Sequence, residues 1–341
     1  MSKHVPARDS YCIAVKESSQ VGEARRSAAA IAHAIGFDQV LSGNVSIVVT
    51  ELANNIVRHA QDGEIILRTV AGAERKAIGL DVVALDRGKG IANISQAFMD
   101  GFSTGSTPGT GLGAVKRLST HAEIFSETSK GTVAWVRFTQ KGATEPPMDL
   151  GVVCLPKPGE EACGDAWAVE STTAVRTVFV VADGLGHGVQ AADASVQAVR
   201  TFRENADRSS EQIMQAIHAG LRSTRGAAVA VIELFRNKRE IVFTGIGNIS
   251  AATIAGATVR SMVSHNGTAG VEARRIQSFS YPWPPDALLV VHSDGLTSQW
   301  NLAQHPGLRF KHPGVITGVL YRDARRLRDD VTVLVARDAI S

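Results

Sequence analysis

The stretch Thr177-Val-Phe-Val-Val-Ala-Asp-Gly-Leu-Gly-His-Gly188 decides the fold expected for the second half of this chain. Its apolar start is rich in β-branched residues, which predicts a buried strand. The strand ends at Asp183, and three glycines behind it let the backbone turn beside the carboxylate. A strand end of this kind can present a carboxylate to a metal ion, but Asp-Gly is also an ordinary turn. Taken alone, the stretch leaves both interpretations open.

Three further acidic sites in the same half stand at the ends of expected strands. Asp165 precedes one strand, Asp294 follows another, and Asp329 opens the last strand of the chain. Hard oxygen ligands of this type are what Mg²⁺ and Mn²⁺ need. Two such ions about 4 Å apart can generate a hydroxide and clamp an in-line phosphoryl displacement. The pattern therefore predicts a two-metal site for phosphoryl chemistry.

These motifs together resemble those of the metal-dependent PPM (PP2C-type) serine/threonine phosphatases, and of their SpoIIE/RsbX branch, over residues 150–337. The metal ligands that the resemblance implies are Asp165, Asp183, Gly184 through its carbonyl, Asp294 and Asp329. In this scheme Asp183 is the catalytic residue that bridges two Mg²⁺ or Mn²⁺ ions. Asp330 is the neighbouring alternative to Asp329, and the family pattern Asp-[Asp/Asn]-x-Thr favours the first acid.

Three other features of this half are not assigned a catalytic or metal-binding role. Thr244-Gly-Ile-Gly-Asn248 matches a buried turn of the family and is interpreted as structural. Thr224-Arg-Gly226 resembles the small RsbX-type enzymes, and no role follows from it. His187 has the chemistry to protonate a leaving group, but a structural or supporting role in its loop is favoured.

The first half contains a helix, expected within residues 40–60, with apolar side chains at helical spacing. Glu51 and Asn55 are four residues apart, so they lie on one face of this helix beside its apolar stripe. The pair fits a base next to a metal ligand. The plainer interpretation is a half-exposed polar pair on an amphipathic helix.

Two glycine-rich segments follow that helix. Asp86-Arg-Gly-Lys-Gly-Ile91 puts an acid at a strand end with a glycine turn behind it. Residues 101–113 contain five glycines and lead into a helix expected at 112–118. Such a segment suits a mobile lid that opens onto a helix N-terminus, where backbone N–H groups attract phosphate. The alternative is a plain flexible loop.

The order of these motifs, completed by Gly131-Thr132, resembles the GHKL ATP-binding fold over about residues 10–139. The resemblance implies Mg-ATP as the ligand, with Asn55 holding Mg²⁺ on the phosphates and Asp86 accepting from the adenine amino group. The remaining nucleotide-binding residues that it implies are Gly88, Gly90, Gly109, Gly111, Gly113 and Thr132.

Residues 100–105 and 111–118 are especially similar to those of the RsbT-type switch kinases among the anti-sigma-factor serine kinases. In that branch Glu51 would be the catalytic general base, which takes the proton of a protein Ser/Thr hydroxyl while Mg²⁺ neutralises the phosphate. No helical hairpin with a phosphoacceptor histidine is evident before Glu51. This argues against a two-component sensor kinase.

The fold class expected is α+β, with two domains. A GHKL (Bergerat) α/β sandwich is expected over residues 1–139 and a PP2C-type αββα sandwich over 150–341. An unpatterned, proline-containing linker over 140–149 separates them.

Composition excludes several other classes of protein. A net charge of +3, scattered charges and few aromatic residues argue against nucleic-acid binding. The three cysteines fit reduced thiols in a cytosol, so a cytoplasmic location is expected. The start shows no apolar leader, and no run of about 18 apolar residues occurs, so neither a signal peptide nor a membrane partner is expected.

The function expected is that of a bifunctional switch in stress-response signalling. The first domain would phosphorylate a Ser/Thr of a STAS-domain antagonist or stressosome scaffold protein, and the second would remove phosphate from the same class of partner. The alternative is that the first domain is a nucleotide-gated module that sequesters or activates a partner, with only the phosphatase catalytic. The partner, the phosphosite, the choice of Mg²⁺ or Mn²⁺ and a homodimer stay open.

Overall fold

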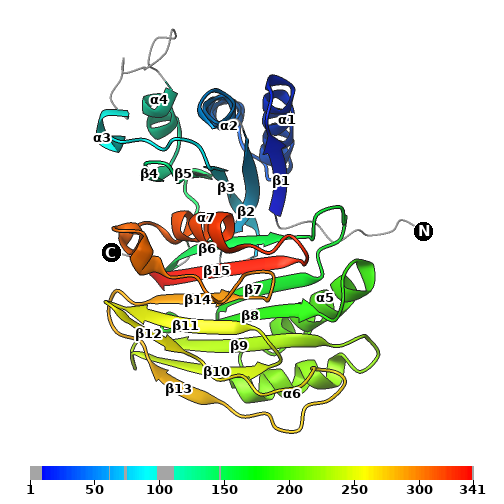
Figure 1. Ribbon diagram of the computed structural model, residues 1–341. Coiled ribbons are helices and arrows are strands. Elements are labelled where there is room, and N and C mark those ends of the chain that lie inside the picture. The colour runs from blue at the N-terminus through cyan, green and yellow to red at the C-terminus, as the bar shows by residue number, and fades with distance from the viewer. Residues whose placement is uncertain (1–9, 61, 73–74, 98–110, 146, 340–341) are drawn as a thin grey trace, which may run out of the picture. The chain divides into compact units, whose positions relative to one another are not determined.

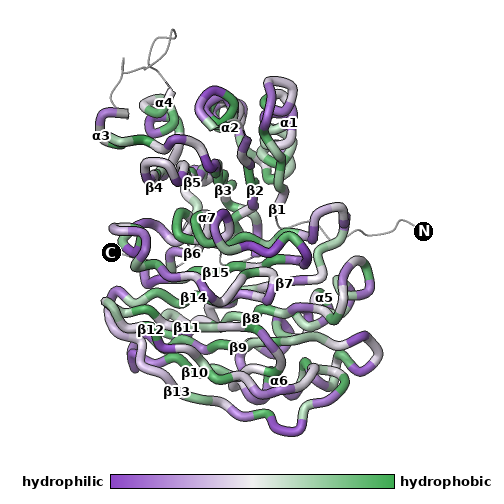
Figure 2. Tube along the Cα trace, in the orientation of Figure 1, coloured by the Kyte–Doolittle hydropathy of each residue, from purple (hydrophilic) through white to green (hydrophobic). Residues whose placement is uncertain are grey.

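The computed structural model describes residues 10–60, 62–72, 75–97, 111–145 and 147–339 (Figure 1). The chain forms two compact units. The first comprises Met1–Glu145 and Phe310–Arg322, and the second comprises Pro146–Arg309 and Asp323–Ser341. In both units hydrophobic residues gather along the strands and hydrophilic residues in the connecting loops (Figure 2).

The first unit is built on a five-stranded antiparallel sheet with the strand order β1-β2-β3-β5-β4. Its elements are β1 (Ser10–Val15), α1 (Ser18–Ala34), α2 (Gln39–His59), β2 (Gly63–Ala71), β3 (Ala77–Asp86), α3 (Ile94–Ala97), α4 (Gly111–Leu118), β4 (His121–Glu127), β5 (Gly131–Thr139) and most of α7 (Pro313–Ala324).

Helices α1 and α2 pack on one face of this sheet because apolar side chains alternate along its strands. In β3, Leu80, Val82 and Ala84 belong to the core that these helices share, and the residues between them point to the other face. Among the described residues, α2 is the one helix long and apolar enough to cross a membrane. Its valine, leucine and isoleucine stripe is buried in this core, as in the core helix of a folded domain.

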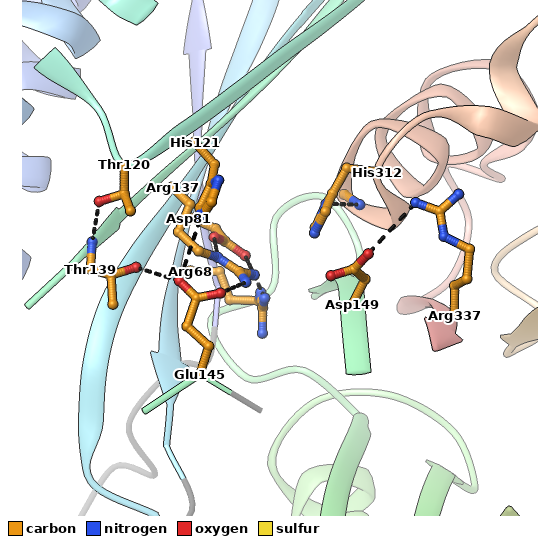
Figure 3. A network of polar contacts seen from close by, with 11 residues as sticks. Arg68, Asp81, Thr120, His121, Arg137, Thr139, Glu145, Asp149, His312 and Arg337 are labelled. Carbon is orange, nitrogen blue, oxygen red and sulfur yellow. Dashed lines mark hydrogen bonds and ion pairs between the residues drawn. The ribbon is translucent and has the colours of Figure 1, made fainter. Parts of the chain in front are cut away.

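The opposite face of the sheet carries a buried row of charges. Arg68, Asp81 and Arg137 are cross-strand neighbours on β2, β3 and β5, and they are 5%, 2% and 4% exposed. Both arginines converge on Asp81 (Figure 3), with Arg68 Nη2–Oδ2 at 2.5 Å and Arg137 Nε–Oδ1 at 2.7 Å. Burial alone would raise the pKa of Asp81, but the charges of Arg137 and Arg68 outweigh it and hold the pKa well below its usual value.

The Asp81→Asn variant should lower the free energy of unfolding by about 3–5 kcal/mol, because it removes the buried carboxylate that both guanidinium groups share. Since the folded pKa is depressed, the stability that Asp81 contributes is present above the unfolded pKa, near 3.8, and is lost as the pH falls below it. Urea unfolding followed by circular dichroism measures both effects. Glu145→Gln is the control: that carboxylate is 38% exposed and 4.0 Å from Arg137, so it should cost less than about 1 kcal/mol. Equal losses in the two variants would contradict this role for Asp81.

The second unit contains two five-stranded antiparallel sheets, ordered β13-β10-β9-β8-β7 and β12-β11-β14-β15-β6. Its elements are β6 (Met148–Leu155), β7 (Asp165–Ser171), β8 (Arg176–Gly184), α5 (Val189–Glu204), α6 (Ser210–Gly220), β9 (Ala227–Phe235), β10 (Glu240–Ile246), β11 (Ser250–Ala255), β12 (Thr258–Ser261), β13 (Phe279–Pro282), β14 (Leu288–His292), the short 3₁₀ turns η1 (Leu302–Gln304) and η2 (Leu308–Phe310), and β15 (Val331–Asp338).

Two apolar layers hold the second unit together. One layer lies between the sheets and includes Phe179 of β8, Phe243 of β10 and Leu289 of β14. The other lies between the first sheet and helices α5 and α6, with Phe202 and Ile217 among its members. The two sheets are therefore stacked, and the helices cover the first of them, which confirms the mixed α+β class.

The division of the chain differs from the sequence prediction in one segment. The linker at 140–149 predicts a single change of domain, whereas the structure places Phe310–Arg322 in the first unit. The apolar residues of α7, such as Val315, Ile316 and Val319, predict that one side of it is buried. They do not indicate which sheet covers that side, and this is why α7 could not be assigned from the sequence.

Candidate functional sites

Helix α2 and the start of α4 form one side of the candidate nucleotide site. Glu51 and Asn55 are both half-buried on the same face of α2. Gly111 begins α4 close to them: a Cβ at Gly111 would lie 3.2 Å from Oε2 of Glu51. The predicted helix is confirmed as Gly111–Leu118, and Gly113 within it is buried. Gly109 and the remainder of the predicted lid lie outside the described residues.

Asp86 stands at the end of β3 with one carboxylate oxygen in use. Its Oδ1 accepts from the backbone N–H groups of Gly88, at 2.7 Å, and Thr132, at 3.2 Å. Burial raises the pKa of Asp86, and these two hydrogen bonds partly offset the increase. Since Oδ1 already accepts these two hydrogen bonds, Oδ2 is the oxygen left to accept from a further donor such as an amino group.

Close backbone packing explains the glycines behind Asp86. Gly90 has φ +71°, and a Cβ on it would lie 2.2 Å from the carbonyl oxygen of Glu127. Sequence reasoning missed Ser126, whose hydroxyl accepts from Ile91 N–H at 2.8 Å and lies 2.9 Å from Thr132 Oγ1. Ser126 thus ties the glycine turn to Thr132. Its place in β4 gave no signal of this.

The candidate metal site collects the acids at the strand ends of the second unit. Asp165 and Asp183 pair directly across β7 and β8. Burial, followed by the charges of Asp165, Asp294, Asp329 and Asp330, raises the pKa of Asp183 to about 9. Burial also raises the pKa of Asp165 to about 7, although the hydrogen bond from Ser293 lowers it. The predicted acids therefore lie close enough to repel one another.

Two of these acids keep a buried oxygen without a donor. Asp165 Oδ2 accepts from the Ser293 hydroxyl at 2.6 Å, whereas its Oδ1 has no hydrogen-bond partner. Asp330 Oδ1 accepts from Lys157 N–H at 2.9 Å, and its Oδ2 likewise has no partner. A buried carboxylate oxygen without a partner is costly, and a cation removes that cost.

Three further polar residues support the acids, and sequence reasoning gave none of them a role here. Thr332 N–H donates to the Ser293 hydroxyl at 2.9 Å, behind Asp165. Asn248 Nδ2 donates to Asp294 Oδ2 at 2.8 Å. The segment Thr244–Asn248, interpreted as a structural turn, thus also reaches a predicted metal ligand. The signal was present, since Ser293 precedes Asp294 and Thr332 completes the Asp-Asp-x-Thr pattern.

The acids do not form a closed cage. Within the described ranges no three His, Cys, Asp or Glu side chains converge into a metal cluster. Nevertheless, the donor set fits a hard divalent cation, because it consists of carboxylates, because Asp165 keeps an unpartnered oxygen, and because the pKa values of Asp165 and Asp183 are raised. His187 contacts Glu160, with its Nδ1 2.8 Å from Oε1 of that residue.

The Gly184→Ala variant should distort the backbone next to Asp183, because a Cβ at position 184 would lie 2.0 Å from the carbonyl oxygen of Ala191. We expect the second unit to lose about 1–3 kcal/mol of stability and to bind Mn²⁺ more weakly. Thermal unfolding with and without Mn²⁺ measures both. Gly43→Ala, where the new methyl meets nothing within 4 Å, is the control and should not destabilise the chain. Unchanged Mn²⁺ binding in the Gly184 variant would contradict the prediction.

Comparison with known proteins matches each half of the chain. Residues 14–138 match the family model of the histidine kinase-like ATPase domain, and residues 173–338 match that of stage II sporulation protein E (SpoIIE). The serine/threonine-protein kinase RsbT of Bacillus subtilis (strain 168) is 33% identical over 133 residues, which are 38% of this chain and 98% of RsbT.

Solved structures are similar to about half of the chain. One, described as "The bacterial stressosome: a modular system that has been adapted to control secondary messenger signaling", is 26% identical with a TM-score of 0.53, covering 56% of this chain and 100% of that one. RsbX in complex with magnesium is 18% identical with a TM-score of 0.49, covering 57% of this chain and 96% of that one.

Proposed function

We propose, for a chain that belongs to the RsbT-like histidine kinase-like ATPases and carries a SpoIIE PP2C-type phosphatase domain, that it both adds and removes a phosphate on a protein Ser/Thr. The observation that carries the kinase half is the likeness to RsbT, which extends over 98% of that kinase. The phosphatase half rests on the mutually repelling acids of the second unit and their unpartnered oxygens.

In the first unit the residues divide the work of phosphoryl transfer. Asn55 would hold Mg²⁺ on the phosphates of ATP, and Asp86 Oδ2 would accept from the adenine amino group. Glu51, one helical turn before Asn55, would take the proton of the attacking hydroxyl. Adenine recognition needs a fixed carboxylate, and the hydrogen bonds from Gly88 and Thr132 to Asp86 provide that fixation.

In the second unit Asp165, Asp183, Asp294 and Asp329 would hold two Mg²⁺ or Mn²⁺ ions, with the Gly184 carbonyl. Ions of this kind supply a hydroxide at neutral pH and neutralise the phosphate when they are bound. The protein's own part is to orient the carboxylates. Ser293 does so for Asp165 and Asn248 for Asp294 through the hydrogen bonds described above.

The substrate we propose is a STAS-domain antagonist or stressosome scaffold protein in the cytoplasm. The likeness to RsbT and to a stressosome structure supports this class. Two opposed activities in one chain waste ATP unless something biases them. We therefore expect partner binding, or the state of one unit, to favour one activity over the other.

The experiment incubates the full chain with a STAS-domain protein, γ-labelled ATP and Mg²⁺. Acid-stable label should appear on the partner and should disappear after a chase with unlabelled ATP and Mn²⁺. Nucleotide binding without any label transfer would support the alternative of a nucleotide-gated binding module. Acid-labile label would indicate histidine phosphorylation and would contradict the Ser/Thr assignment.

A further inference from the structure

Helix α7 lies within the SpoIIE match over residues 173–338, yet its residues up to Arg322 belong to the first unit. Neither the SpoIIE match nor the match to the ATPase family, over residues 14–138, predicts this arrangement. The contacts that hold the segment Phe310–Arg322 in place indicate what it does there.

One side of α7 approaches the sheet through glycine. Gly314 and Gly318 are four residues apart, so they share a face of the helix. A Cβ on Gly314 would lie 2.3 Å from Cδ1 of Trp135, and one on Gly318 would lie 2.7 Å from Cγ1 of Val133. Since no side chain larger than hydrogen fits at either position, α7 sits directly on β5.

The beginning of the helix is anchored by His312. Its ring stacks on Trp135 with the centroids 3.6 Å apart and the planes inclined by 10°. Its backbone N–H donates to Glu123 Oε2 at 2.6 Å, and its Nδ1 accepts from Gly314 N–H at 3.0 Å. The start of α7 therefore has a defined position along the sheet.

The other end of the segment reaches the candidate nucleotide site. Arg322 is 2% exposed, and its Nη1 donates to the carbonyl oxygen of Asp86 at 3.3 Å. The Arg322 carbonyl in turn accepts from Nη2 of Arg87. The Asp86 carbonyl also faces Gly131, where a Cβ would lie 2.1 Å away. The main chain of Asp86 is thus held between β5 and α7.

From these contacts we infer that Arg322 is a positioning residue of the nucleotide site, which sets the place of the Asp86 carboxylate through its main chain. Recognition of adenine then depends on a helix from the SpoIIE half of the sequence. The inference rests on the proposed ATP-binding role of Asp86. The positive charge of Arg322 also lowers the pKa of Asp86, which favours the ionised carboxylate that would accept from adenine.

The test compares Arg322→Gln, Arg322→Lys and Gly318→Val in the full chain, using titration with fluorescent analogues of ATP and GTP. Arg322→Gln should bind Mg-ATP about tenfold more weakly, because the main chain of Asp86 loses the charged donor that holds it in place. It should also lower the preference for ATP over GTP by a similar factor. Arg322→Lys should restore part of both, since an ammonium group can still donate.

Gly318→Val leaves Arg322 unchanged but forces α7 away from Val133, so it should lower the same preference. Arg25→Gln, an exposed arginine on α1 of the same unit, is the control and should change neither value. Circular dichroism checks folding. A merely structural role would reduce the fraction of protein that binds, but not the preference between ATP and GTP.

The outcomes distinguish a failure of the proposed ATP-binding function from a failure of the role assigned to Arg322. If wild type binds neither nucleotide, the proposed function of the first unit fails. If wild type prefers ATP and both Arg322→Gln and Gly318→Val keep that preference, the proposed function stands and the role of Arg322 is refuted.

Discussion

The Asp183→Asn variant should lose metal-dependent phosphatase turnover by about a thousandfold, while its metal-free fold becomes more stable than that of wild type. The loss of activity follows because Asp183 is the acid predicted to bridge both ions, and metal stabilisation of the transition state is worth several kcal/mol. The gain in stability follows from electrostatics, since asparagine needs no proton to be neutral, whereas burial and four other acids force Asp183 to take one up on folding.

The pH dependence of this gain has a definite sign. The folded pKa of Asp183, about 9, lies above its unfolded value of 3.8. Stability from this group is therefore complete below pH 3.8 and is lost as the pH rises toward 9 in the absence of metal. The advantage of the asparagine variant should grow over the same range. Bound Mn²⁺ should restore wild type and have little effect on the variant.

Hydrolysis of p-nitrophenyl phosphate with Mn²⁺, together with thermal unfolding in EDTA or Mn²⁺, measures these effects. Asp193→Asn, an exposed aspartate on α5, is the matched control and should behave as wild type in every assay. If Asp183→Asn kept its activity, or if Mn²⁺ stabilised it as strongly as wild type, Asp183 would not be a metal ligand.

The second large effect is expected for Glu51→Gln, which should slow label transfer to the STAS-domain partner by about 10²–10⁴-fold. Glutamine keeps the size of the side chain but cannot accept the proton of the attacking hydroxyl. Nucleotide should still bind, because Asn55 and Asp86 are unchanged. The split between binding and transfer distinguishes a general base from a residue that only holds ATP.

Labelling kinetics and a nucleotide titration on the same preparation provide the measurement. Glu23→Gln, on the exposed face of α1, controls for the loss of one carboxylate in this unit. Normal transfer by Glu51→Gln would rule out the base. Transfer absent from wild type as well would instead favour the nucleotide-gated binding module.

Much of the fold could be predicted because its signals are local. The β-branched run that becomes β8 and the helical stripe of α2 each identify an element without any knowledge of its neighbours. Strand β13 was missed because Phe279–Pro282 is short and has no buried position. Helix α7 was missed as part of the first unit because the choice between two apolar sheets depends on contacts with Trp135 and Val133, which its own pattern does not record.

In the candidate sites, too, only the residues with a local sequence signal could be predicted. Strand-end acids such as Asp165 and Asp183 are visible because an acid next to glycine interrupts an apolar strand. The groups that orient them are ordinary serine, threonine and asparagine residues. Ser293 and Asn248 acquire their roles only when the chain brings them within hydrogen-bond distance of Asp165 and Asp294. Arg322 is a stronger case, since 236 residues separate it from Asp86.

The membership of Phe310–Arg322 in the first unit has a consequence for how such a protein can be divided. The chain leaves the first unit after Glu145 and returns to it at Phe310, so no single break yields two complete parts. A fragment that ends near residue 145 would lack α7 and would leave the surface around Trp135 exposed. Two separate genes could replace this one only if the α7 segment were duplicated or supplied in trans. Evolution can therefore lose or keep the two units together more easily than it can separate them.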